Sequence, residues 1–442
     1  MIILLLILSV VLIVVLTAKL NIHPFLALLV ASLFFGICAG MSFEIILKSI
    51  EEGFGGTLGK IGLVILFGVI IGSFLENSGG AYKLAEVVLK LIGKKNIHAA
   101  MAIIGYIVSI PVFADSGFII LSPLNKSLSK KAGISIAGTG VALILGLLLS
   151  HVMVPPTPGP IAAAGILDAN LGLVMVVGIF VSSLSLVVAI IYSKHVAGKT
   201  YIDPNPELSE ADIEEKIKQA PSALKSFLPI LIPIALIVSK SLVEFNYGKD
   251  LNSFLSFVTF IGSPVIALLI GMFLSFLLPK KFDMELLADS GWVGKSLLSA
   301  STILLITGAG GVFGKVLQNS GIGNVMSDML SGVSLGIWLP FILTAAIKTA
   351  QGSSTVALIT AAAIMAPLMV TMGFDTEMQK ALLVIAIGAG AMVVPHANDS
   401  GFWIVTQLTG MDIKTGYKLY TTGALIVGCF AAFLVFLISL II

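Results

Sequence analysis

Residues 24–29 read Pro-Phe-Leu-Ala-Leu-Leu, and a similar stretch, Pro-Val-Ile-Ala-Leu-Leu, occupies residues 264–269, 240 positions later. Two further segments return in the same order at almost the same offset: 75–79 as 317–321 after 242 positions, and 153–156 as 392–395 after 239. Chance similarity among apolar segments is the alternative, but it does not explain a nearly constant offset. The sequence therefore predicts an internal duplication of one hydrophobic unit.

The composition of the chain predicts a membrane protein. Of 442 residues, 57% are hydrophobic and 11% are charged, and the mean hydropathy is +1.10. Soluble domains carry about 25% charged residues, so a water-soluble globule is excluded. The net charge of +2 comes without a basic stripe, which gives no reason to expect a nucleic acid partner. Cys38 and Cys429 lie in apolar runs, and we expect no disulfide, metal site or cofactor.

Long apolar runs predict an all-α polytopic fold rather than a barrel of alternating strands. About ten crossing helices are expected: 2–18, 24–40, 60–76, 172–193, 227–244, 255–278, 296–317 and 418–441, and the interrupted stretches 137–167 and 378–408. Two apolar segments with a polar centre, 97–131 and 333–370, predict re-entrant hairpins. The domains expected are a first repeat at 1–194, a cytoplasmic linker at 195–225 and a second repeat at 226–442.

The placement of charges predicts how the chain is threaded. Lysines cluster at 83–131, 194–225 and 280–281, and acidic residues occupy other loops: Glu44, Glu51, Glu52, Glu244 and Asp250. Cytoplasmic loops are rich in lysine, so the clusters are assigned to the cytoplasm and the acidic loops to the outside. Five crossings then separate Pro24 from Pro264. Because that number is odd, the second repeat is expected to be inverted with respect to the first.

Four breaks interrupt the apolar segments, two in each repeat: Pro111–Gly117, Pro155–Pro160, Thr349–Thr355 and Pro395–Gly401. The second holds four prolines in six residues, which cannot continue a helix. Irregular backbone at membrane depth occurs only where protein or a water-filled cavity satisfies it. Ordinary turns at the membrane surface are the alternative. The halves of the first hairpin, 97–110 and 118–131, are too short to cross, which favours two re-entrant hairpins and two unwound helices.

Breaks that meet at the membrane midplane would form a binding site. We expect helix N-termini near Gly117, Pro160, Ser354 and Ser400 to point inward, and such ends favour anions. The available side chains are mostly hydroxyls and amides, which suit a small anionic hydroxy acid. The predicted substrate-binding residues are Ser116, Gly117, Thr157, Pro158, Gly159, Lys348, Gln351, Gly352, Ser353, Ser354, Thr355, His396, Asn398 and Ser400.

Ionisable groups at depth cost about 2.5–3.5 kcal/mol each on insertion and are therefore functional candidates. Asp115 and Asp399 are the first candidates for carrying a coupling proton, and capping of half-helices is their alternative role. His396 and His151 flank the proline breaks and are further candidates. A neutral structural role is equally open for His151. Lys348 is expected to pair with a substrate carboxylate or with one of the two aspartates.

Three of these motifs carry a family resemblance. Pro155–Leu167, Gln351–Ala357 and His396–Trp403 resemble signatures of the gluconate permease (GntP-type) family, and the resemblance runs over nearly the whole chain. It implies a proton symporter for gluconate-like sugar acids in the bacterial inner membrane, within the ion-transporter superfamily. It also implies a homodimer with a fixed scaffold domain and an elevator-type transport domain.

Departures from the family pattern leave the substrate open. Thr157 stands where relatives often have His, Ala114 where they have an aromatic residue, and Lys348 where Arg is expected. Glycerate, D-serine and other hexonates are alternative substrates, and sodium is the alternative coupling ion. A channel or transceptor is a further rival. An intramembrane enzyme is disfavoured because the sequence lacks a paired His-Glu metal motif and a Gly-x-Ser-x-Gly elbow.

Overall fold

The computed structural model describes residues 2–93, 96–206, 210–247, 252–322, 325 and 336–442. These ranges contain helices and no strand, which confirms the all-α class. The helices of residues 2–199 are α1 (Ile2–Val14), η1 (Val15–Lys19), α2 (Pro24–Cys38), α3 (Phe43–Asn77), α4 (Gly80–Ile92), α5 (Ile97–Val108), α6 (Ala114–Lys131), α7 (Ile136–Met153), α8 (Pro158–Ile166), α9 (Leu171–His195) and η2 (Ala197–Lys199). The later ones are α10 (Glu210–Gln219), α11 (Ala223–Tyr247), α12 (Ser253–Ile261), α13 (Pro264–Ser275), η3 (Met284–Leu287), α14 (Trp292–Asn319), α16 (Trp338–Gln351), α17 (Ser354–Met365), α18 (Glu377–Met392), α19 (Ser400–Thr409), α20 (Ile413–Gly416), η4 (Tyr417–Thr421) and α21 (Thr422–Ser439).

Seven helices in the described ranges are long and apolar enough to cross a membrane, and the number is eight if the bent pair α12–α13 is one span. This confirms a polytopic membrane protein. The remaining two of the ten predicted crossings correspond to α2, which has 15 residues, and to the interrupted pair α18–α19. Of the segments discussed above, Lys94, Lys95, residues 207–209 and 333–335, and Asp250 lie outside the described residues.

Two predicted spans differ from the structure in their bounds. The span predicted at 60–76 is the second half of α3, a helix of 35 residues that begins at Phe43 after its N-cap Ser42. The span predicted at 255–278 is bent by 62° between α12 and α13. Gly262, Ser263 and Pro264 lie at this bend, and a proline fits the first turn of a new helix but not the interior of a continuous one.

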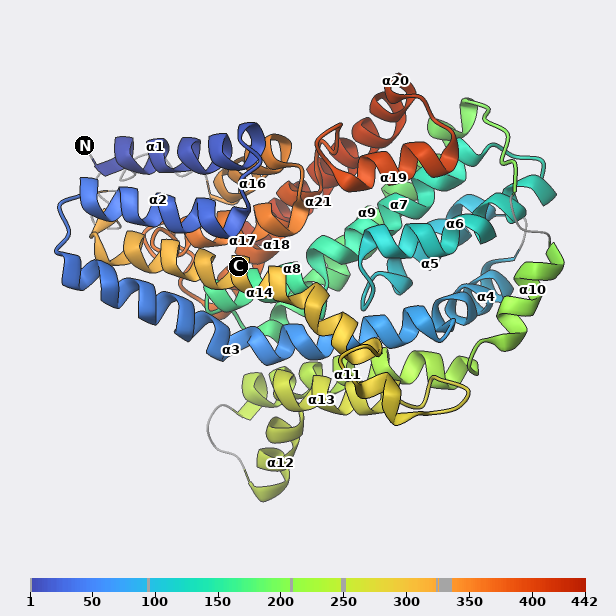
Figure 1. Cartoon of the computed structure of the whole chain (residues 1–442), viewed down its shortest axis with the longest axis horizontal. Coiled ribbons are helices and arrows are strands. Elements are labelled where there is room, and N and C mark those ends of the chain that lie inside the picture. Colours follow the sequence, from blue (N-terminus) through green and yellow to red (C-terminus); the bar gives the residue numbers. More distant parts are fainter. Residues whose placement is uncertain (1, 94–95, 207–209, 248–251, 323–324, 326–335) are drawn as a thin grey trace.

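The two longest described helices, α3 and α14, lie side by side across the molecule (Figure 1). Glycines allow their close approach. A Cβ atom added to Gly53 of α3 would lie 2.6 Å from the carbonyl oxygen of Gly311 on α14. Small residues at such a crossing let two helix backbones pack closely inside a membrane.

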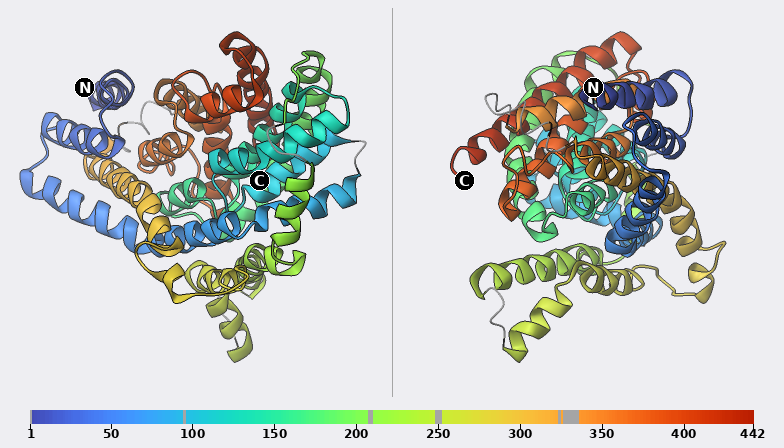
Figure 2. Two further views of the ribbon diagram at one scale, coloured as in Figure 1. Left: turned by 45° about the vertical axis from the view of Figure 1, so that its right-hand side comes forward. Right: turned by 90° about the vertical axis from the view of Figure 1, so that its left-hand side faces the viewer.

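The broken helices occupy the interior. Every residue of α7 is buried, and so are all residues of α17 from Val356 onward. A helix that is apolar on all sides requires neighbours on all sides, and α7 packs against α5, α6, α9 and α18. The two further views in Figure 2 show the same arrangement, with the α11–α13 segment projecting from the body of the protein.

All four predicted breaks are present. The first separates α5 from α6, and the others lie between α7 and α8, α16 and α17, and α18 and α19. Helices α17 and α19 begin at Ser354 and Ser400, as expected. Helix α6 begins at Ala114 and α8 at Pro158, a few residues before the expected Gly117 and Pro160. Asp115 and Ser116 therefore lie in the first turn of a helix and not in the irregular stretch.

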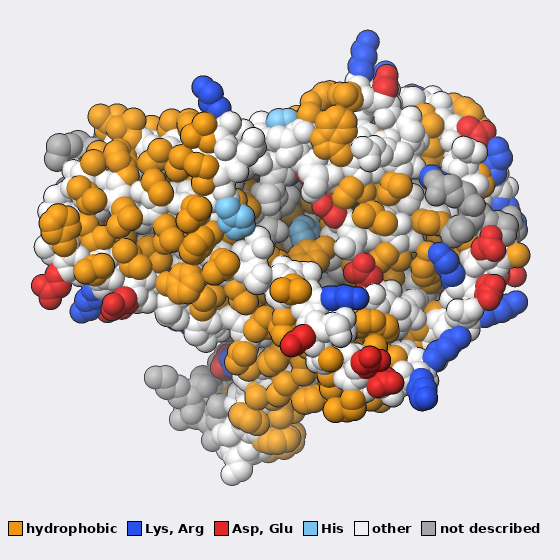
Figure 3. Space-filling model, viewed as in Figure 1, with side chains coloured by type: hydrophobic (Ala, Val, Ile, Leu, Met, Phe, Trp, Pro, Cys, Tyr) orange, Lys and Arg blue, Asp and Glu red, His pale blue; other side chains and the backbone are white. Residues whose placement is uncertain are grey.

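One end of the molecule is rich in lysine (Figure 3). Part of the predicted linker forms α10, which packs against α4 and α6. Lys216 of α10 lies 5.6 Å from the centroid of the Tyr82 ring, and Lys130 pairs with Asp203 at 3.0 Å. The linker is thus partly docked on the two helices beside it.

Candidate functional site

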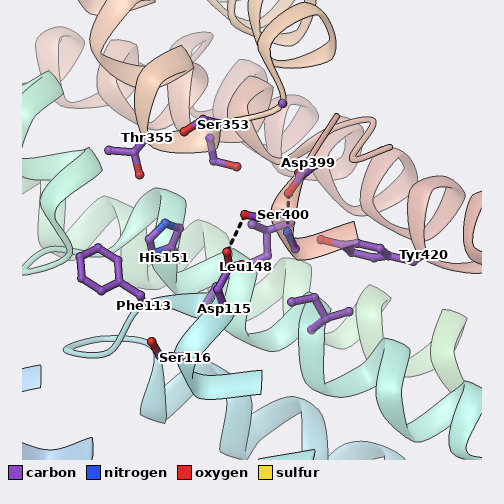
Figure 4. Close-up of a pocket in the computed structure, with 15 residues that line it drawn as sticks. Phe113, Asp115, Ser116, Leu148, His151, Ser353, Thr355, Asp399, Ser400 and Tyr420 are labelled. Carbon is purple, nitrogen blue, oxygen red and sulfur yellow. Dashed lines mark hydrogen bonds between the residues drawn. The ribbon is translucent and has the colours of Figure 1, made fainter. Parts of the chain in front are cut away.

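Residues from both halves of the chain surround a central cavity of about 300 Å³ (Figure 4). Helices α6, α7, α17 and α19, the ends of the breaks and η4 contribute to it. The lining residues are Phe113, Ala114, Asp115, Ser116, Ile144, Leu148, His151, Gly352, Ser353, Ser354, Thr355, Asp399, Ser400, Gly401 and Tyr420. The central cavity therefore brings together side chains that are nearly 300 positions apart in the sequence.

The N-terminus of α6 supplies the first wall of the cavity. Helix α5 ends at Val108, and the chain turns through Pro111 before α6 begins at Ala114. The residue before the helix is Phe113, which offers no capping side chain. The first turn of α6 therefore presents backbone N–H groups, together with Asp115 and Ser116, toward the cavity.

The second hairpin supplies the opposite wall. Gly352 ends α16 in a left-handed conformation with φ of 84°, and its N–H donates to the carbonyl of Lys348 at 2.8 Å. A residue with a Cβ is disfavoured at this φ, which explains the glycine. Ser353 then caps α17 by accepting a hydrogen bond from the N–H of Val356 at 3.3 Å. Ser353, Ser354 and Thr355 line the central cavity.

Asp399 is the residue before α19, and two groups bind its carboxylate. Its carboxylate accepts a hydrogen bond from the N–H of Gly401 at 2.7 Å, so it is an N-cap. The ammonium group of Lys348 donates to the same carboxylate and also to the carbonyl of Gly352. In this structure Asp399 caps α19 and pairs with Lys348.

A second carboxylate connects the two halves. The hydroxyl of Ser400 donates to Asp115 at 2.7 Å (Figure 4). No ion pair to Asp115 is present among the described residues. Asp115 thus faces the cavity with a hydroxyl donor and no cation, whereas Asp399 is fully engaged with Lys348.

His151 lies in the last turn of α7, and 6% of its surface is exposed. Its Nδ1 atom has no hydrogen-bond partner in the described structure, and its ring lies 6.1 Å from that of Phe113. His151 lines the central cavity. A buried imidazole nitrogen without a partner is suited to form a hydrogen bond with a ligand hydroxyl.

Several predicted residues lie outside the cavity lining. Thr157 donates to the carbonyl of Val154 at 2.7 Å, and the N-terminus of α8 packs against α17, where a Cβ added to Gly159 would lie 2.7 Å from Leu358. His396 and Asn398 bind the carbonyl of Thr349, at 2.6 and 2.9 Å. The remaining residues of this group are Gly117, Pro158, Lys348 and Gln351.

Sequence reasoning did not select six lining residues: Phe113, Ala114, Ile144, Leu148, Gly401 and Tyr420. Phe113, Ala114 and Gly401 lie within breaks that the sequence did identify. Tyr420 lies in the short π-helix η4, stacked on Phe402 with ring centroids 6.5 Å apart. No feature of the sequence around Tyr420 indicates that it lines the site. The described residues hold no group of three or more His, Cys, Asp or Glu side chains placed to bind a metal ion.

Two solved transporter structures have this fold. The YdaH transporter of Alcanivorax borkumensis superimposes with a TM-score of 0.60 over 88% of this chain and 87% of that chain, at 16% identity. MtrF of Neisseria gonorrhoeae, from a class of antimetabolite efflux pumps, has a TM-score of 0.62 over 88% and 84% of the two chains, at 15% identity.

Several relatives are more similar in sequence than these two transporters. The chain is 36% identical to the inner membrane permease YgbN of Escherichia coli, over 97% of this chain and 96% of that protein. It is 32% identical to a gluconate permease of Pseudomonas aeruginosa (97% and 95% covered) and 33% identical to the D-serine transporter DsdX of Escherichia coli (99% and 98%). The profile of the GntP family permeases matches residues 1–441. The chain belongs to the GntP family of permeases.

Proposed function

We propose that this permease imports a small hydroxylated organic acid, of the gluconate type, by proton symport across the bacterial inner membrane. The observation that carries the proposal is the composition of the central cavity. The N-termini of α6, α17 and α19 border it, and these ends favour a carboxylate. The hydroxyls of Ser116, Ser353 and Thr355 suit a polyhydroxylated chain.

The relatives support the same class of substrate. Gluconate permeases of Pseudomonas aeruginosa and Bacillus subtilis match nearly the whole chain. An Escherichia coli relative is an inner membrane permease, which supports the same location for this protein. The central cavity of about 300 Å³ is at the lower limit of ordinary ligand sites, as a small acid requires.

We assign the binding of the coupling proton to Asp115. The ionised form of Asp399 is already satisfied by Lys348 and by the N–H of Gly401. Asp115 has only the Ser400 hydroxyl and faces the cavity, so a proton can reach it together with the substrate. Protonation would remove a negative charge from the site just as an anion enters.

One observation favours a second substrate. A carboxylate without a cation partner also suits the ammonium group of a zwitterion, and the chain is 33% identical to a D-serine transporter. With D-serine, Asp115 would bind the ammonium group and the helix N-termini the carboxylate. Gluconate and D-serine therefore place different groups against Asp115.

The arrangement also supports two repeats, at residues 1–194 and 226–442, joined by a linker at 195–225. The helix order α5–α6–α7–α8–α9 corresponds to α16–α17–α18–α19–α21. The contacts are reciprocal, because α6 packs against α19 while its counterpart α17 packs against α8. Such reciprocity is expected of two units related by an approximate two-fold axis, as in inverted repeats. We propose that α3 and α14 belong to the scaffold and the broken helices to an elevator-type transport domain.

Uptake into proteoliposomes tests the proposal. With an acidic exterior, purified protein is expected to accumulate labelled gluconate, and a proton ionophore is expected to abolish the accumulation. Replacing sodium by choline at fixed pH separates proton from sodium coupling. Competition by glycerate and D-serine ranks the substrates. If no organic acid or amino acid is accumulated under a pH gradient, the proposal is wrong.

A further inference from the structure

A second cavity adjoins the central one on the side of the first hairpin. It has a volume of about 190 Å³ and lies between α3, α14 and the α5–α6 break. We call it the Lys295 cavity, because Lys295 and Glu76 are its charged residues. Phe113 and Ser116 line both this cavity and the central one. In Figure 4, Ser116 lies on the side of the central cavity away from Ser353 and Asp399.

A third cavity continues this series. It has a volume of about 480 Å³ and shares Glu76 with the Lys295 cavity. We call it the lysine vestibule, because Lys216, Lys280 and Lys281 line it. These lysines belong to the loops that the distribution of charge assigns to the cytoplasm. Three cavities linked by shared residues thus lead from the central cavity toward the cytoplasmic face.

The polar groups of the Lys295 cavity are available to a ligand. Lys295 and Glu76 line the same space, yet neither takes part in an ion pair within the described part of the chain. The hydroxyl of Ser116 has no hydrogen-bond partner in those residues. Lys295 is an exposed residue of α14, while Ser116 is partly buried beside the central cavity. An ammonium group and a hydroxyl without partners, placed between the surface and the central cavity, fit a carboxylate in transit.

The repeat-related cavity on the other side provides a comparison. It has a volume of about 390 Å³ and is lined by Thr57, Gly314 and Gln318, which lie 242 positions from Ser299, Gly72 and Glu76 of the Lys295 cavity. This outer cavity shares no lining residue with the central one. Of these two repeat-related cavities in the described part of the chain, the Lys295 cavity alone shares lining residues with the central cavity, so the route between them leads toward the cytoplasmic side.

We propose that the Lys295 cavity is a second anion site, at which Lys295 binds the carboxylate of the transported acid between the central cavity and the lysine vestibule. The inference rests on the proposed function, since it takes a small carboxylate as the cargo. Glu76 lies at the boundary with the lysine vestibule. Its carboxylate would repel the same anion and so shorten the time that the anion stays bound at Lys295. The site would affect only the steps in which the substrate enters from, or leaves to, the cytoplasm.

Side-specific kinetics test this site with gluconate as the probe. Lys295→Met is expected to raise the KM for gluconate presented from the cytoplasmic side, in inverted vesicles, by about tenfold. The KM from outside, in right-side-out vesicles, should stay within about twofold of the wild type, because the central cavity is unchanged. Lys295→Arg should restore most of the cytoplasmic KM. Lys199→Met, an exposed lysine on the same side, is the matched control and should have no effect.

The outcomes separate this inference from the proposed function. If wild-type protein transports gluconate and Lys295→Met has the wild-type KM from both sides, the second site is refuted and the transport proposal stands. If the wild type transports no organic acid, both the second site and the proposed function are wrong. A second measurement uses Ser299→Cys with Cys38 and Cys429 replaced by Ser. Gluconate should slow its modification by an impermeant thiol reagent from the cytoplasmic side, and an unchanged rate would contradict the proposal.

Discussion

Lys348 in the last turn of α16 and Asp399, the N-cap of α19, form an ion pair beside the central cavity, which Asp399 lines. The side chain of Lys348 is 1% exposed and that of Asp399 is 11% exposed. The pair joins the C-terminal end of one broken helix to the N-terminal end of another, and Gly352 supplies a further acceptor for the ammonium group. It therefore fixes the second hairpin against the fourth break, where both border the site.

Removing one partner of this pair should be costly, because the other charge would remain buried without a counter-ion. Lys348→Met and Asp399→Asn are each expected to destabilise the protein by about 3–5 kcal/mol. The double variant should recover a large part of that loss, since it leaves no unpaired charge and Asn keeps the cap of α19. Thermal unfolding in detergent measures all three. Losses that simply add in the double variant would show that the two residues act independently.

Asp115→Asn should uncouple transport from the proton. We expect the variant to lose accumulation under a pH gradient but to keep exchange of labelled for unlabelled substrate. Ser400→Ala is the control, since it removes only the hydroxyl donor and should lower the rate by about tenfold or less. Accumulation by Asp115→Asn at the wild-type level would remove Asp115 from the coupling role.

The positions of the four breaks could be predicted from sequence because their causes are local. Prolines lack an N–H donor, and Ser353 and Asp399 are ordinary N-cap residues, so the starts of α17 and α19 follow directly. The start of α6 could not be predicted in the same way, because Phe113 is no capping residue. As a result the helical setting of Asp115 was not foreseen.

Other features depend on contacts distant in sequence. Nothing in the sequence around Tyr420 places it beside a break that ends some 20 residues earlier. The packing of α10 against α4 and α6 likewise depends on tertiary contacts of a charged segment that looks like a free linker. The proline-rich second break was expected to line the site, but its helix start is covered by α17, which only the packing reveals.

His151 is expected to recognise a substrate hydroxyl, because its buried Nδ1 has no partner in the described structure. His151→Phe should raise the KM for gluconate by about 10- to 100-fold, the range for a lost hydrogen bond in a buried site. His151→Gln, which keeps a donor and an acceptor, should retain more of the affinity. An unchanged KM in His151→Phe would show that the imidazole only fills space.

Asp168, which lies between α8 and α9 outside the spanning segments, forms an ion pair that should make stability depend on pH. Lys60 donates to Asp168 at 2.8 Å, and this bond holds the pKa of the Asp168 carboxyl below its usual value of 3.8. The carboxyl therefore contributes stability above pH 3.8, and the contribution is lost as the pH falls through its lowered pKa. Both side chains are more than half exposed, so the effect stays below about 1 kcal/mol.

The measurement is the difference in melting temperature between wild type and Asp168→Asn. This difference should be small and constant between about pH 7 and pH 5, and should shrink at lower pH. Addition of salt should reduce it as well, because the pair is exposed to solvent. A difference that grows on acidification would contradict the assigned ion pair.

The contact between α3 and the second break should limit the movement of the transport domain. A Cβ atom added to Gly68 of α3 would lie 2.9 Å from the carbonyl oxygen of Pro156. This oxygen belongs to the backbone, so no side-chain rotation can relieve the contact. Gly68→Ala is therefore expected to destabilise the protein by about 1–3 kcal/mol and to slow uptake. Substrate binding, measured by thermal shift, should be nearly unchanged because Gly68 does not line the central cavity.

Gly59, nine residues earlier on the same helix, is the matched control. Apart from its chain neighbours and the backbone of its own helix, no atom lies within 4 Å of a Cβ added there. Gly59→Ala should raise stability by about 0.5–1 kcal/mol, the ordinary gain from replacing a helical glycine, and leave uptake unchanged. The two substitutions are chemically identical, so opposite signs in melting temperature isolate the contact with Pro156. If Gly68→Ala transports as fast as Gly59→Ala, the close approach of α3 and the second break at Pro156 does not restrain the transport cycle.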